Sequence, residues 1–198
     1  MSLWQGGPLV LASKSSARRA LLEAAGIPIV VDPADIDERA SEASAPDGKA
    51  AAVILARTKA AAVAKRRPND LVLGADQTLD LDSRRFSKPK SVAAAREQLA
   101  ALAGRTHSLH SAAAVARGND VLFETVATAR LTMRPLDAKS LDAYLAAAVG
   151  DVTTSVGAYR LEGLGVHLFE KIEGDHFTIL GLPLLALLAY FRGAGLLR

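Results

Sequence analysis

The sequence has no cysteine among its 198 residues. Disulfide bonds, thiolate metal sites and cysteine nucleophiles are therefore excluded, and any bound metal must be held by oxygen atoms or histidine. The four histidines form neither an HExxH motif nor any other compact metal-binding spacing. His107 and His110 lie in a strand pattern at an odd offset, which places them on opposite faces. We therefore assign them structural or surface roles.

Long hydrophobic runs are also absent. The most apolar segment, 179–191, contains Gly181 and Pro183 and is shorter than the roughly 20 residues that span a bilayer. The first residues include no basic region, and the apolar run 9–12 stops at Ser13, too early for a secretory signal. We expect a cytoplasmic protein with no membrane partner.

Neither a strong excess of charge nor a low-complexity tract is present. The formal net charge is +3, and the lysines and arginines are scattered along the chain. A nucleic-acid partner is therefore not required, and small anionic substrates are equally compatible. Because half of the residues are apolar, the chain can bury a sizeable core. We expect residues 1–198 to form a single domain.

The signatures of several common enzyme folds are missing as well. The sequence contains no GxGxxG, no GxxxxGK[ST] and no GxSxG, so dinucleotide-binding, P-loop and α/β-hydrolase folds lose support. Apolar runs instead predict strands over 8–12, 28–31, 71–75, 106–117, 121–133 and 166–172. Helical spacing and capping residues predict helices over 16–25, 47–65, 91–102, 137–148 and 182–191. This alternation, with a hairpin turn signal at 118–120, predicts an α/β fold with a mixed sheet.

The segment 13–19 has the composition of a phosphate-binding turn. Hydroxyl groups, the backbone amides of a helix N-terminus and the guanidinium groups of Arg18 and Arg19 converge there. An ordinary capped helix with solvated arginines would show the same pattern. On this helix we expect Ala20, Leu21 and Ala24 to face inward, and Arg18 and Arg19 to lie toward its start.

Asp76 follows the predicted strand 71–75 and precedes Gln77. The carboxyl ends of strands are where α/β sheets place reactive residues. A carboxylate there could activate water or hold a divalent cation, although an aspartate that only binds turn amides would look the same. Lys59 and Lys88 could each offer a positive charge to an anion, but isolated lysines are usually solvated.

Eight short segments, spread over almost the whole chain, form a more specific pattern when they are read in order. They are 11–13 with 18–22, 35–38, 55–60, 74–77, 88–89, 157–159, 162–163 and 181–184. In this order they resemble the Maf family of nucleotide pyrophosphatases. The resemblance implies an elongated mixed β-sheet flanked by helices, in two lobes with a central cleft, as in Maf and ITPase-like proteins. It also implies a nucleoside triphosphate substrate, an Mg²⁺ or Mn²⁺ cofactor and a homodimer.

The resemblance also implies roles for individual residues. Asp76 corresponds to the proton acceptor, and Ser13, Arg18 and Glu38 correspond to substrate-binding positions. Asp76 and Glu38 would hold the metal. The expected catalytic residues are Arg18, Lys59, Asp76 and Lys88.

Three positions divide the family by substrate, and here they are Ala17, Gln77 and Glu162. Members acting on 7-methyl-GTP typically have Trp, Gln and Glu, whereas members acting on dTTP and UTP have Arg, Thr and Gln. Gln77 and Glu162 favour 7-methyl-GTP, and a carboxylate can accept hydrogen bonds from guanine or oppose a methylated base's charge. Ala17 matches neither group, so dTTP/UTP or broad specificity is the alternative.

Two other functions are compatible with parts of the pattern. A non-catalytic nucleotide-binding regulator of cell division would need the lysines but not a carboxylate beside its anionic ligand, so Asp76 favours an enzyme. A phosphomonoesterase could use the same positive cleft. The products separate these functions, because pyrophosphate marks the Maf reaction, orthophosphate marks a phosphatase, and a binding protein releases neither.

Overall fold

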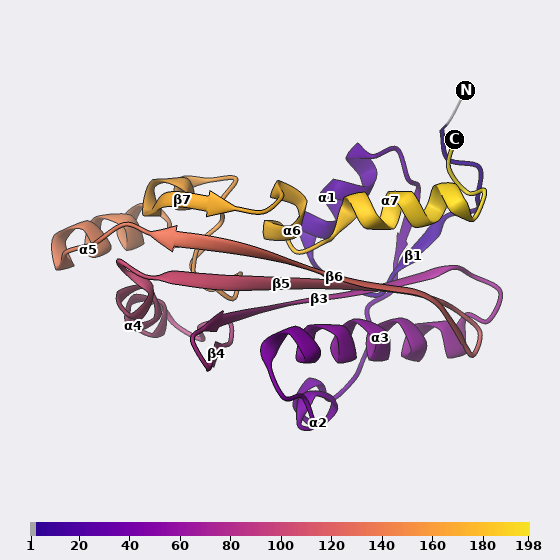
Figure 1. Cartoon of the computed structure of the whole chain (residues 1–198), viewed down its shortest axis with the longest axis horizontal. Coiled ribbons are helices and arrows are strands. Elements are labelled where there is room, and N and C mark those ends of the chain that lie inside the picture. The colour runs from indigo at the N-terminus through magenta and orange to yellow at the C-terminus, as the bar shows by residue number, and fades with distance from the viewer. Residues whose placement is uncertain (1–2) are drawn as a thin grey trace.

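The computed structural model describes residues 3–198, which form a mixed β-sheet with helices on both faces (Figure 1). The strand order is β2-β1-β3-β5-β6-β7, and β4 pairs with β3. β1 is parallel to β2 and β3, and the other pairs are antiparallel. The α/β class and the mixed sheet predicted from the sequence are confirmed. No helix within these residues is long and apolar enough to cross a bilayer.

The strands and helices have the following bounds. The strands are β1 Leu9–Leu11, β2 Ile29–Val31, β3 Val72–Leu81, β4 Arg84–Phe86, β5 Thr106–Arg117, β6 Asp120–Met133 and β7 Phe169–Glu173. The helices are α1 Ser16–Ala24, α2 Glu38–Glu42, α3 Gly48–Arg66, α4 Val92–Leu102, α5 Ala138–Ala147, α6 His176–Ile179 and α7 Leu184–Gly193. The expected hairpin between β5 and β6 is present, with its turn at residues 118–119.

Three long strands, β3, β5 and β6, run the length of the sheet and join two lobes (Figure 1). In one lobe, α4 and α5 pack against the sheet around buried residues such as Leu99, Leu131 and Leu145. In the other lobe, α1 and α7 cover one face around Leu73 and Phe191, and α3 covers the opposite face. Each lobe therefore has a core of its own, and the two cores share the long strands. Burial of each large apolar side chain in these cores contributes about 1.5–3 kcal/mol to stability.

β3 differs from the prediction, because it does not end before Asp76 but continues to Leu81. β5 pairs with β3 as far as Asp80, and the hydroxyl of Thr78 donates to the carbonyl of Gly48 at 2.8 Å. The polar residues after Ala75 therefore have partners inside the structure, and the strand can continue through them.

α1 also differs, in the face that it buries. Arg18 and Leu22 are the buried residues, whereas Ala20 and Ala24 are exposed. The prediction was wrong for these two alanines, whereas Leu21 is partly buried against the core of this lobe. It followed the apolar residues of the helix, because a charged side chain is seldom part of a buried stripe. Arg18 is buried because its guanidinium finds oxygen acceptors inside the protein.

The two histidines of β5 have the structural roles assigned to them. His107 is 1% exposed, and its Nε2 lies 2.7 Å from the hydroxyl of Tyr159. Burial lowers the pKa of His107 to about 4. His110 makes a 2.9 Å contact from Nδ1 to the hydroxyl of Thr128. The His107 contact anchors the segment around Tyr159 to the sheet.

Candidate active site

The candidate site lies where one edge of β3 is left open. β1 pairs with β3 only as far as Leu73, and β4 begins to pair with it at Leu79. No strand among residues 3–198 covers this edge of β3 over 74–78. A cleft of about 830 Å³ opens here and is lined by segments from both lobes. All nine residues singled out from the sequence line it: Ser13, Ala17, Arg18, Glu38, Lys59, Asp76, Gln77, Lys88 and Glu162.

A very close contact between α3 and β3 positions one wall of the cleft. A Cβ atom on Gly74 would lie 2.1 Å from the carbonyl oxygen of Ala56 and 2.5 Å from the amide nitrogen of Ala60. Both distances are far below van der Waals contact, so only glycine permits this approach. Ala56 and Ala60 flank Lys59 in the same turn of α3. Because strand side chains alternate, Gly74 and Asp76 share the face that meets the helix.

The first turn of α3 is attached to the same face of β3. The amide of Gly48 donates to Oδ2 of Asp80 at 3.1 Å, while the carbonyl of Gly48 accepts from Thr78. A Cβ atom on Gly48 would lie 2.3 Å from both oxygens of Asp80. α3 is therefore held against β3 at its first turn and again at the turn that carries Lys59.

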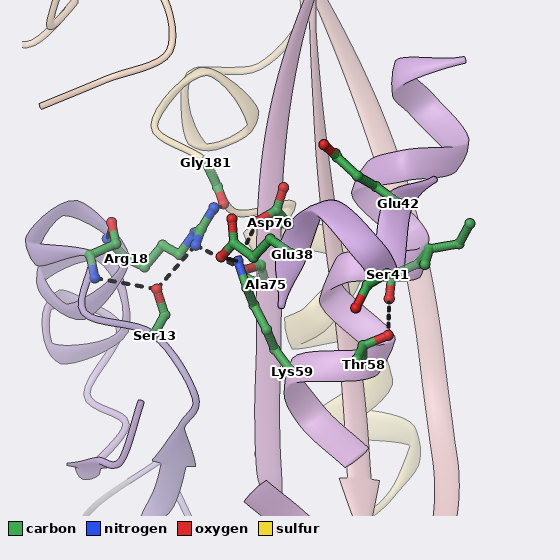
Figure 2. A network of polar contacts seen from close by, with 12 residues as sticks. Ser13, Arg18, Glu38, Ser41, Glu42, Thr58, Lys59, Ala75, Asp76 and Gly181 are labelled. Carbon is green, nitrogen blue, oxygen red and sulfur yellow. Dashed lines mark hydrogen bonds and ion pairs between the residues drawn. The ribbon is translucent and has the colours of Figure 1, made fainter. Parts of the chain in front are cut away.

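Lys59 is the centre of the polar network in the cleft (Figure 2). Its Nζ lies 2.5 Å from Oδ1 of Asp76 and 2.7 Å from Oε1 of Glu38. The side chains of Lys59 and Asp76 are each 12% exposed, whereas Glu38 is 55% exposed. Glu38 begins α2, which Asp37 caps. One ammonium group thus bridges a shielded carboxylate and an open one.

Arg18 joins three segments at the base of the cleft (Figure 2). Its Nε donates to the carbonyl of Gly181 at 2.8 Å, and its Nη1 donates to the carbonyl of Ala75 at 2.9 Å and to Oγ of Ser13 at 3.1 Å. Burial lowers the pKa of the Arg18 guanidinium, and the charges of Asp76 and Glu38 oppose this shift. Arg18 therefore provides the carbonyl of Ala75, on the open edge of β3, with the hydrogen bond that a pairing strand would otherwise donate.

The amide of Gln77 has a fixed orientation. Its Nε2 lies 3.0 Å from Oγ of Ser111, 3.1 Å from the carbonyl of Thr178 and 2.9 Å from that of Ile179. The Ser111 hydroxyl donates its own hydrogen to Thr178, so it can only accept from Gln77. The amide oxygen Oε1 is consequently turned toward the side of Gly181. Gln77 presents a hydrogen-bond acceptor there.

Glu162 lies on the other lobe and has a basic partner. Nε of Arg160 donates to Oε1 of Glu162 at 2.9 Å, and Nη1 of Arg160 donates to Asp151 at 3.1 Å. Lys88 also lines the cleft, is exposed, and forms no ion pair with any described residue.

Comparison with known proteins identifies the family. A model of the Maf-like protein family matches residues 8–194. The chain belongs to the Maf-like family. A relative from Rhodopseudomonas palustris, named nucleoside triphosphate pyrophosphatase, is 58% identical over 100% of this chain and 99% of its own length. A 7-methyl-GTP pyrophosphatase from Mesorhizobium japonicum is 49% identical over 94% of this chain and 96% of its own. A solved HAM1 protein from Coxiella burnetii is 20% identical, covers 64% of this chain and 72% of its own, and has a TM-score of 0.45.

The donor set of this Maf-like cleft can be tested against a divalent metal. No group of three or more histidine, aspartate or glutamate side chains within residues 3–198 is arranged to hold one. Mg²⁺, however, commonly takes only one or two protein carboxylates and completes its shell with water and substrate oxygens. Asp76 and Glu38 already share one cationic partner, Lys59. These two carboxylates fit a cation that arrives with the substrate.

Sequence reasoning missed several basic residues of the cleft. Among the described residues, seven basic and four acidic side chains line it, so an anionic ligand meets an excess of positive charge. The unforeseen basic residues are Lys14, Arg39, Arg85 and Arg160. Lys14 lies inside the predicted phosphate-binding turn and Arg160 lies between two recognised segments, so both had a local signal. Arg39 and Arg85 had none, because α2 and β4 were not predicted.

Replacing Arg18 with lysine should destabilise the protein by roughly 1.5–3 kcal/mol, because a lysine cannot reproduce the fork that serves Gly181 and Ala75. Urea denaturation monitored by circular dichroism measures this free energy of unfolding. Arg19→Lys is the matched control, since Arg19 is exposed and pairs with Glu23. Equal stabilities of the two variants would contradict the structural role of Arg18.

Proposed function

We propose that this protein is a metal-dependent nucleoside triphosphate pyrophosphatase. The observation that carries the proposal is the shielded Lys59–Asp76 pair, with Glu38 beside it, in a cleft with excess positive charge. A cleft that only bound a polyanion would gain nothing from a buried carboxylate on its wall. The names of the curated relatives support the same reaction class.

In the proposed reaction a water molecule attacks the α-phosphorus of the nucleotide. Asp76 accepts the proton from this water, and the bond between the α-phosphorus and the bridging oxygen to the β-phosphate breaks. The products are a nucleoside monophosphate and pyrophosphate. Lys59, Lys88 and Arg18 neutralise the negative charge that develops on the phosphate oxygens in the transition state. Electrostatic stabilisation of this kind is usually the largest single contribution to the catalysis of phosphoryl transfer.

The divalent cation, Mg²⁺ or Mn²⁺, would be held by Asp76 and Glu38 together with phosphate oxygens. When bound, it would supply positive charge that lowers the barrier to attack on a polyanion. Ser13 and the amides at the start of α1 would bind phosphate oxygens, because a helix N-terminus attracts anions. Lys59 would stay close to both carboxylates and exchange part of its contact with them for the substrate.

For the base, the proposal favours 7-methyl-GTP. Gln77 offers an amide oxygen whose orientation is fixed, and Glu162 offers a carboxylate. Two acceptors suit the donor-bearing edge of guanine, whereas uracil and thymine place an acceptor on each side of a single N–H donor. Ala17 leaves room at the third specificity position. The relative that is named a 7-methyl-GTP pyrophosphatase supports this choice, and dTTP, UTP or a broad range remains the alternative within the family.

Asp76→Asn should lower turnover by about 100-fold or more, because an amide cannot accept the proton from water. Nucleotide binding, measured by calorimetry, should persist, since the isosteric amide removes one negative charge beside a polyanion. Release of pyrophosphate and monophosphate by the wild-type protein, with Mg²⁺ or Mn²⁺ present, is the reference. A variant with near-normal turnover would remove Asp76 from its role. Orthophosphate in place of pyrophosphate would indicate a phosphatase, and no turnover by the wild type would indicate a binding protein.

Glu162→Gln should reduce the preference for 7-methyl-GTP over UTP and dTTP by about tenfold, because the cationic base loses an opposing charge and an acceptor. The comparison uses kcat/KM for each triphosphate, measured by pyrophosphate release. Glu170→Gln, on an exposed residue outside the cleft, controls for the change in net charge. An unchanged substrate ranking would contradict the specificity proposal and leave the reaction class in place.

A further inference from the structure

Each of the four carboxylates that line the cleft within residues 3–198 has a basic partner that also lines it. Asp76 and Glu38 contact Lys59, and Glu162 contacts Arg160. The remaining pair is Glu42 with Arg85, whose Oε2 and Nη1 atoms lie 3.1 Å apart. Neither residue has a role in the proposed mechanism. We propose that Arg85 is a further binding residue for the phosphate chain, and that Glu42 is its counter-ion until the substrate displaces it. This inference rests on the proposed function.

The position of Arg85 follows from the pairing of β4 with β3. Arg85 lies directly opposite Asp80 in this antiparallel pair, and directly opposed residues point to the same face of a sheet. Side chains of Asp76 and Asp80 share a face because they are separated by an even number of residues. Arg85 therefore projects from the face that carries Asp76, and it lines the same cleft.

Glu42 approaches Arg85 from α2. It is the last residue of α2, the helix that begins with Glu38, and it lines the same cleft as Asp76 and Glu38. α2 has no buried residue. It is attached to the cleft by its ion pairs, Glu38 with Lys59 and Glu42 with Arg85. The Glu42–Arg85 pair thus links α2 to β4.

The strengths of the competing interactions favour exchange of partners. The side chains of Arg85 and Glu42 are 35% and 27% exposed, and such partly exposed pairs are weak because water screens them. A guanidinium binds a phosphate group through two parallel hydrogen bonds, which are shorter and stronger than neutral ones. A triphosphate also carries several charges, so it competes well against one carboxylate.

The neighbouring Arg84 provides a matched control. It has the same charge and belongs to the same strand, but its guanidinium lies over the ring of Phe86, with Cζ 4.5 Å from the ring centroid. Arg84 is not among the residues that line the cleft. Arg84→Gln and Arg85→Gln therefore change net charge equally and differ only in position.

The test measures binding of inorganic tripolyphosphate to the full chain by calorimetry, together with KM and kcat for the preferred triphosphate. Arg85→Gln should weaken tripolyphosphate binding and raise KM by at least about tenfold, as expected for loss of a charged hydrogen bond. Arg84→Gln should change both by less than about twofold. Glu42→Gln should act in the opposite direction and tighten tripolyphosphate binding, because Arg85 is then released. Thermal unfolding shows that each variant is folded.

Two results would overturn the proposal: equal effects of Arg85→Gln and Arg84→Gln, or weaker tripolyphosphate binding in Glu42→Gln. The second result would mean that the pair only holds α2 in place. Because tripolyphosphate binding does not require turnover, the outcome is independent of the proposed reaction. Wild-type protein that binds tripolyphosphate through Arg85 but releases no pyrophosphate would support this inference and contradict the proposed function.

Discussion

The contact between α3 and β3 at Gly74 is the constraint on which the rest of the site depends. A strand residue with any side chain would collide with the backbone of Ala56 and Ala60, so the helix lies unusually close to the sheet only because glycine is there. This closeness puts the ammonium of Lys59 against Asp76. The attachment of Gly48 to β3 then fixes the start of the helix, and with it the approach of α2.

A second constraint is the open edge of β3. A fully paired strand would bury its backbone groups in a ladder and leave no room for a ligand, but β1 ends early and β4 begins late. The buried carbonyl of Ala75, on this unpaired edge, accepts a hydrogen bond from Arg18, which also donates to the carbonyl of Gly181. The cleft therefore lies where strand pairing is interrupted, and the buried guanidinium of Arg18 binds a carbonyl that a neighbouring strand would otherwise bind. Each carboxylate that lines the cleft has a basic partner, so the free protein avoids uncompensated charge while keeping the positive excess that a polyanion requires.

Local patterns predicted most of the long elements, and non-local contacts explain several misses. The first residues of the expected strand 166–172 instead belong to a 3-10 helix, Leu164–Leu168. Helix caps such as Ser91 and Asp137, and the turn between β5 and β6, are encoded within a few residues, and each lies where the pattern placed it. Burial of Arg18 was missed because one of its acceptors is 163 residues away in the chain. The position of Arg85 was missed because it depends on the pairing of a three-residue strand, which has no periodicity of its own. The nine predicted site residues all line one cleft because the family motifs preserve three-dimensional proximity that spacing alone does not reveal.

The reaction proposed for this cleft is the attack of water on the α-phosphorus of a nucleoside triphosphate. Hydrolysis in water enriched with oxygen-18, followed by mass spectrometry of both products, tests it most directly. Attack at the α-phosphorus predicts one labelled oxygen in the nucleoside monophosphate and none in the pyrophosphate. Label in pyrophosphate would mean attack at the β-phosphorus, and label in orthophosphate would mean stepwise removal of terminal phosphates. Either result would contradict the proposed chemistry of Asp76.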